Sequence, residues 1–131
     1  MTKANRSKFC STYSLVVVLV LGCAVGPALA ASLKSLMGDM RDNTNSAKDV
    51  LTNFDTASAN RIMERYAVDA RAASDMFTGQ GGAKEKDLAS RFKQLAATAN
   101  ATSQAPMTKA GFRKALSDVT NECKSCHSAY N

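Results

Sequence analysis

The stretch Val119-Thr-Asn-Glu-Cys-Lys-Ser-Cys-His-Ser-Ala-Tyr130 lies at the C-terminal end of a 131-residue chain, and the rest of the fold can be worked out from it. Cys123, Cys126 and His127 are spaced i, i+3 and i+4, so a helix would place all three side chains on one side. Apolar residues continue this spacing upstream as far as Phe112. The pattern predicts an amphipathic helix that carries two thiols and an imidazole on its inner face.

Two cysteines three positions apart, followed at once by a histidine, form the attachment signature of c-type haem. Each thiol can add to one vinyl group of the porphyrin, and the imidazole of His127, the only histidine of the chain, can then bind the iron. A tetrahedral zinc site would need a second pair of Cys or His ligands. A thioredoxin-like redox pair usually lies in a strand-then-helix context, which the sequence does not suggest. We therefore expect one covalent haem c, attached through Cys123 and Cys126.

The first thirty residues have the pattern of an export signal. Three cations precede an apolar run at 15–21, and small residues at 28–30 suit a signal peptidase. The run is shorter than the about 20 residues of a membrane span. We expect a cleaved signal peptide, residues 1–30, and one domain, residues 31–131, delivered to the bacterial periplasm. The alternative is a lipobox-like site that would leave a lipidated Cys23 and a membrane anchor.

The distribution of charge argues against a nucleic-acid partner. The chain has 17 Lys and Arg residues against 11 acidic residues, a net charge of +6, but three of the cations belong to the expected signal peptide. Without those three the net charge is +3. Positive and negative residues then alternate along the chain instead of forming blocks. We expect no nucleic-acid binding.

Residues 33–77 predict two helices. This stretch contains one glycine and no proline, and it lacks the alternation of a β-strand, so helix is favoured. A turn is expected near residues 55–59, where Thr56 or Ser58 can cap the second helix. The apolar stripe of the first helix comprises Leu33, Leu36, Met37, Met40, Ala47, Leu51 and Phe54, and that of the second comprises Ile62, Met63, Tyr66, Ala70, Ala73 and Phe77.

Two further breaks define a third and a fourth helix. The sequence Thr78-Gly-Gln-Gly-Gly82 ends the second helix and is the clearest break in the chain. A helix is then expected over about 83–101. Residues 102–106 end it with Pro106, and Thr108 can cap the last helix.

Four amphipathic helices with short connections predict an all-α fold, an antiparallel up-down-up-down four-helix bundle. In this order the start of the first helix and the end of the fourth lie at the same end of the bundle, together with the turn between the second and third. The haem is therefore expected to contact residues near that end. These residues are Leu36, Met37, Met40, Met76, Phe77 and Leu88, and we also expect Tyr130 to pack against the haem or the first helix.

The second axial ligand of the iron is expected to be a methionine. With His127 as the proximal ligand, no second histidine is available, and a thioether is the remaining soft neutral ligand. Met37 and Met40 lie on the inner face of the first helix at the haem end, and Met37 is favoured. Met76 falls beside its helix's apolar stripe. An open or water-bound iron is the remaining alternative, and Lys34, Arg41 and Lys124 are candidate contacts for propionates or a partner.

The chain resembles the class II c-type cytochromes, which comprise cytochrome c-prime and its low-spin relatives. The segment 119–130 looks like the last helix of that family, and Ser35-Leu-Met-Gly-Asp-Met40 looks like the first helix of its low-spin members. In those members the methionine at the position of Met37 binds iron, whereas high-spin members leave the iron open to small gases. The family commonly has a basic residue three or four positions after the haem histidine. This chain has Tyr130 and Asn131 there.

The expected function is that of a periplasmic electron carrier, a cytochrome with one haem ligated by His127 and Met37. Its partners would be periplasmic redox proteins, and a homodimer through the bundle faces is an additional expectation. A gas-binding cytochrome with an open distal site is one alternative, and an interaction subunit of a larger redox complex is another. We do not expect an enzyme, because the sequence shows no second cluster of titratable residues beside the motif.

Overall fold

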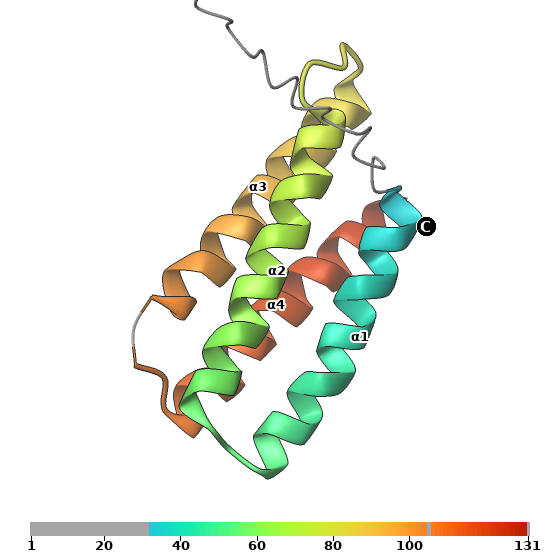
Figure 1. The fold of residues 1–131 in the computed structure, drawn as a ribbon. Coiled ribbons are helices and arrows are strands. Elements are labelled where there is room, and N and C mark those ends of the chain that lie inside the picture. The colour runs from blue at the N-terminus through green and yellow to red at the C-terminus, as the bar shows by residue number, and fades with distance from the viewer. Residues whose placement is uncertain (1–31, 105, 131) are drawn as a thin grey trace, which may run out of the picture.

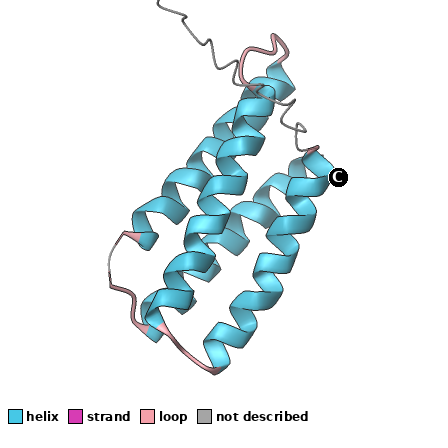
Figure 2. Ribbon diagram, in the orientation of Figure 1, coloured by secondary structure: helices cyan, strands magenta, loops and turns pink. Residues whose placement is uncertain are grey.

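A computed structural model describes residues 32–104 and 106–130, so the expected signal peptide and Cys23 lie outside the described residues. The described part folds into four helices without a strand, as the sequence predicted (Figures 1 and 2). They are α1 (Leu33–Thr52), α2 (Thr56–Phe77), α3 (Ala83–Ser103) and α4 (Lys109–Tyr130). None of these helices is both long enough and apolar enough to cross a membrane.

Most helix boundaries have a local chemical cause. Ser32 caps α1 by accepting a hydrogen bond from the Ser35 amide, 3.1 Å away. Thr108 accepts from the Gly111 amide at 3.0 Å and so caps α4, as predicted. Gly79 follows α2 with a φ of +86°, a left-handed conformation that glycine adopts without strain.

The predicted cap of α2 was wrong. Asp55, rather than Thr56 or Ser58, precedes the first turn, and its carboxylate accepts from the Ser58 amide at 2.7 Å. A carboxylate is a strong acceptor and is favoured by the helix dipole at this end. Hydrogen bonding with the Ser58 side chain, the bond from its amide and the charge of Arg61 hold the pKa of Asp55 below its ordinary value.

The helices form an antiparallel bundle in which each packs against its neighbours in sequence and α4 also meets α1. Figure 1 shows that the end of α4 lies beside the start of α1, at the same end of the bundle as the α2–α3 turn. This arrangement is the one expected from the order of the helices. We call this the motif end, because it carries Cys123, Cys126 and His127.

The core has two parts. The larger part fills the middle of the bundle, and its most deeply buried large side chains are Met63, Tyr66 and Phe112. The smaller part centres on Leu36, Ala73, Leu88 and Phe92. Cys126 and Tyr130 pack against this second part, so it belongs to the motif end.

Packing between the helices is uneven. Helices α2 and α3 are the most closely packed pair, and α1 and α4 are the most loosely packed of the neighbouring pairs. The α2–α3 approach is close enough for the Ser74 hydroxyl to donate to the Ala89 carbonyl at 2.9 Å. The looser side is where the thiols and the imidazole lie.

Candidate functional site

Helix α4 brings the two thiols and the imidazole to one side of the bundle. Cys123 and Cys126 are half-buried free thiols, and His127 is exposed in the last turn of the helix. The i, i+3 and i+4 spacing therefore places all three side chains on one side of the helix, as predicted. Cys123 packs against the larger core and Cys126 against the smaller one, so the motif spans both.

A groove of about 690 Å³ runs between α1 and α4. Its volume falls within the range of about 300–1,000 Å³ that is usual for small-molecule and cofactor sites. Cys123 and His127 line one side, and α1 supplies most of the other. The groove-lining residues from α1 are Lys34, Met37, Gly38, Met40, Arg41, Thr44, Asn45 and Lys48.

A small cavity of about 40 Å³ lies beside the groove and shares four of its residues, Met37, Met40, Cys123 and His127. Both thiols, the imidazole and two thioethers line it. The other residues of its lining are Arg91, Phe92, Leu95 and Glu122. The sequence analysis predicted that Met37 and Met40 lie near the motif. In the structure both methionines line this cavity together with the two thiols and the imidazole.

The two methionines differ in burial. Met40 is 6% exposed and belongs to the larger core, whereas Met37 is half-buried and packs against both core parts. Met40 therefore has an evident packing role. Met37 lines the same two cavities with less of its side chain committed to the core.

Gly38 opens the groove further. It lies in the interior of α1, where a glycine costs roughly 0.5–1 kcal/mol relative to alanine. It has no positive φ, and a Cβ built there would meet nothing within 4 Å. No packing contact in the described protein requires a glycine at this position. The absence of a side chain leaves room for a bound group to approach α1 closely.

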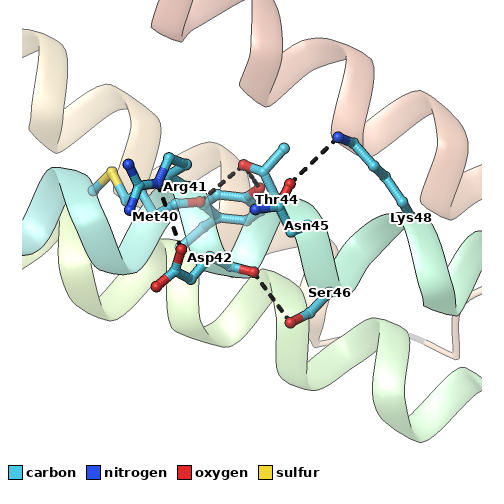
Figure 3. Close-up of polar contacts among 8 residues, drawn as sticks. Met40, Arg41, Asp42, Thr44, Asn45, Ser46 and Lys48 are labelled. Atoms are coloured by element: carbon cyan, nitrogen blue, oxygen red, sulfur yellow. Dashed lines mark hydrogen bonds and ion pairs between the residues drawn. The ribbon is translucent and has the colours of Figure 1, made fainter.

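A chain of hydrogen bonds forms a polar part of the groove wall (Figure 3). The Thr44 hydroxyl donates to the Met40 carbonyl at 2.8 Å and lies 2.6 Å from the Tyr66 hydroxyl. Because Thr44 already uses its proton, Tyr66 is the donor in that second bond. Burial raises the pKa of Tyr66 above its ordinary value. Tyr66 was expected to be an ordinary core residue, but it also lines the groove.

Three cations of α1 border the groove, at Lys34, Arg41 and Lys48. Arg41 pairs with Asp42 at 3.5 Å, and Lys48 donates to Asn45 at 3.3 Å (Figure 3). Both contacts are exposed and weak, so these cations can turn toward an anionic group in the groove. Lys124, the third cation considered from the sequence, is exposed and lines neither cavity.

The remaining predicted residues lie around the smaller core. Leu36, Phe77 and Tyr130 pack there together with Cys126, and the rings of Phe77 and Phe92 stack with centroids 6.1 Å apart. Leu36, Phe77 and Tyr130 line neither cavity, although the sequence predicted that they would contact the haem. Met76 also lines neither cavity, and it is 36% exposed and does not pack against the smaller core, so the structure does not bring it to the motif. The reason is its position beside the apolar stripe of α2.

The electrostatics of the thiols do not suit a dithiol redox centre. Burial raises the pKa of Cys123, and burial likewise raises that of Cys126, although Arg91 opposes the second shift. Reactive thiols in redox motifs have a lowered pKa instead. Within the described residues, no group of three His, Cys, Asp or Glu side chains is arranged to hold a bare metal ion. The zinc interpretation therefore gains no support.

The residues present do fit a haem. A groove in the size range of cofactor sites has the Cys123 thiol on its border, and the Cys126 thiol lines the small cavity beside it. Nitrogen and thioether donors on facing helices complete what such a group requires. Gly38 leaves space on α1, and the cations at the rim could pair with carboxylates. Phe92 and Leu95 give the small cavity beside the groove an apolar wall.

The comparisons give no further identification: no family model, curated protein or solved structure matches this chain. The chemistry of the groove and the motif therefore carries the functional argument.

Proposed function

We propose that this chain is a c-type cytochrome of the class II kind, with one haem linked by thioether bonds to Cys123 and Cys126, and that it transfers single electrons. One observation carries the proposal most directly. The two thiols, the imidazole of His127 and the thioethers of Met37 and Met40 line one cavity between loosely packed helices.

The residues of the chain would divide the work of holding this cofactor. The thiols would tether it, while His127 from α4 and Met37 from α1 would each supply a donor atom to its iron. Thioether ligation and an apolar shell favour the reduced state of the iron. When bound, the haem supplies a site for one reversible electron, and the protein itself needs no acid or base.

Met37 is the better candidate for the second donor. Met40 is nearly fully buried in the larger core, so its side chain is already used in packing. Met37 is half-buried and lies next to Gly38, where α1 leaves room. A ligand from α1 facing a ligand from α4 would also hold together the most loosely packed pair of neighbouring helices.

The cellular role follows from the same proposal. Export to the periplasm would deliver the chain to the compartment where c-type haem is attached in bacteria. Its partners would then be periplasmic redox proteins, and the cations at the groove rim favour partners with an acidic docking face. Homodimer formation through a bundle face is a separate proposal, which the solution mass would test.

The absorption spectrum of the exported protein tests the axial ligands. In the oxidised protein, a weak far-red band from methionine ligation is expected, and Met37→Ala should abolish it and produce high-spin iron. Met40→Ala serves as the matched control and should keep the band while lowering stability. A wild-type protein that is high-spin and binds carbon monoxide readily would instead favour the gas-binding alternative.

A further inference from the structure

The first half of α3 and the end of α4 are joined at the motif end by a polar cluster. We call it the Asp87 cluster; it is made of Asp87, Arg91, Ser125 and Tyr130. Arg91 donates to the Asp87 carboxylate at 2.6 Å and to the Ser125 hydroxyl at 3.1 Å. The Tyr130 hydroxyl donates to the same Asp87 oxygen. Ser125 lies between the two cysteines of the motif, so this cluster reaches the motif itself.

The two charges of the cluster are placed unequally with respect to the candidate site. Arg91 lines the small cavity together with Cys126 and His127, but Asp87 does not. The carboxylate is instead held by Tyr130, whose ring also has the Arg91 guanidinium 5.9 Å from its centroid. The positive member of the pair is therefore the one that faces the cavity.

We infer that the Asp87–Arg91 pair sets the reduction potential of the group held at Cys123 and Cys126, with Arg91 raising the potential and Asp87 moderating that effect. This inference rests on the proposed function. A cation beside a redox centre disfavours the more positive oxidised state, and a partner anion partly cancels it. Tyr130 is a positioning residue, because its hydrogen bond keeps the carboxylate away from the cavity.

Other charges near the cavity do not replace Arg91. Glu122 also lines the cavity, but its carboxylate accepts a hydrogen bond from Gln94 at 3.2 Å on the α3 side. Lys84 lies with its ammonium 5.3 Å from the centroid of the Tyr130 ring and does not line the cavity. Arg91 is thus the cation of α3 that lines the cavity at the thiols.

Redox titration of single variants tests the inference. Arg91→Gln should lower the reduction potential, and Asp87→Asn should raise it. Each shift should be up to about 59 mV, which for one electron is a tenfold change in the ratio of reduced to oxidised protein. The double variant should return toward the wild-type value. Arg91→Lys keeps the charge and should therefore retain most of the wild-type potential.

A matched control comes from an ion pair on the same helix but away from the motif. Lys114 and Asp118 of α4 are 2.7 Å apart, and Lys114→Gln changes the charge by the same amount as Arg91→Gln. It should leave the potential within a small fraction of the Arg91 effect.

The sign of the two shifts separates an electrostatic role from a structural one. If the pair only fastened α4, Arg91→Gln and Asp87→Asn would expose the site alike and move the potential in the same direction. That result would overturn the inference, as would two variants with the wild-type potential. A wild-type protein without covalent haem would remove the proposed function and this inference together, whereas either of the preceding results would remove the inference alone.

Discussion

The two sides of this bundle are built differently. Where α2 meets α3, small buried residues bring the helices close, and the Ser74 hydroxyl reaches the Ala89 carbonyl. Where α1 meets α4, the larger side chains of Met37, Cys123 and His127 border a groove of about 690 Å³. A bundle that needed only to fold would gain by closing both sides alike. The difference agrees with the proposal that the α1–α4 side holds a bound group.

Two equivalent substitutions should separate these regions most strongly. Met63 is completely buried in the larger core, so Met63→Ala should cost about 2–5 kcal/mol of unfolding free energy. Met37→Ala, made in the haem-free chain, should cost far less, because Met37 is half-buried beside the groove. Urea denaturation of both variants measures this. Equal losses would mean that the α1–α4 side is packed as firmly as the centre of the bundle.

Enlarging a small residue on the tight side should also destabilise the protein. Ala70 of α2 has no exposed surface, and Ala70→Leu should lower the unfolding free energy by about 1–3 kcal/mol through overpacking. Thermal unfolding followed by circular dichroism would record the change. An unchanged midpoint would show that the α2–α3 side has slack that the structure does not reveal.

On the groove side a small-to-larger change should have the opposite sign. Gly38→Ala should stabilise the haem-free chain by about 0.5–1 kcal/mol, because alanine favours the helix and its methyl group meets no atom within 4 Å. The same denaturation measurement applies. A loss of stability in the haem-free chain would contradict the open groove.

The smallest expected effect concerns the acid stability of the motif end. The hydrogen bond from Tyr130, and then the bond and charge of Arg91, hold the pKa of Asp87 below its ordinary value. A carboxyl with a lower pKa in the folded than in the unfolded state adds stability at neutral pH. That stability is lost as the pH falls below about 4 and through the folded-state pKa.

The unfolding free energy of Asp87→Asn should therefore decrease less steeply than that of the wild type below about pH 4. A series of denaturation curves at decreasing pH measures this. Asp69 works in the opposite direction, because burial and Asp39 raise its pKa, so Asp69→Asn is the informative control. A profile for Asp87→Asn that is parallel to wild type would show that the carboxyl has no perturbed pKa.

Much of the fold could be predicted because its signals are local. Glycine and proline mark the second and third breaks, and polar capping residues near 55–59 mark the first. With apolar residues at helical spacing these signals predict four helices, and short connections then give their antiparallel order. Small errors arose at the ends. Helix α1 stops at Thr52, before Phe54, and α3 extends to Ser103 instead of about residue 101. Phe54 still reaches the core, with its ring 6.4 Å from that of Phe112.

The site was only partly predictable. The thiols and His127 form one local motif, and helical geometry carried Met37 and Met40 to it. Arg91 was missed, because its partners Ser125 and Tyr130 lie far away in sequence and are brought close only by the packing of α3 on α4. The signal that could have found it is the i, i+4 pair Asp87–Arg91 on the face of α3 toward the motif.

The central claim is that a haem is joined covalently to α4 at the α1–α4 groove. The most direct test is the mass of the exported, denatured protein, measured beside a Cys123→Ala/Cys126→Ala variant. The account predicts that the wild-type chain carries the mass of one haem through denaturation and that the variant carries none. A wild-type chain with the bare polypeptide mass, from cells able to attach c-type haem, would contradict it.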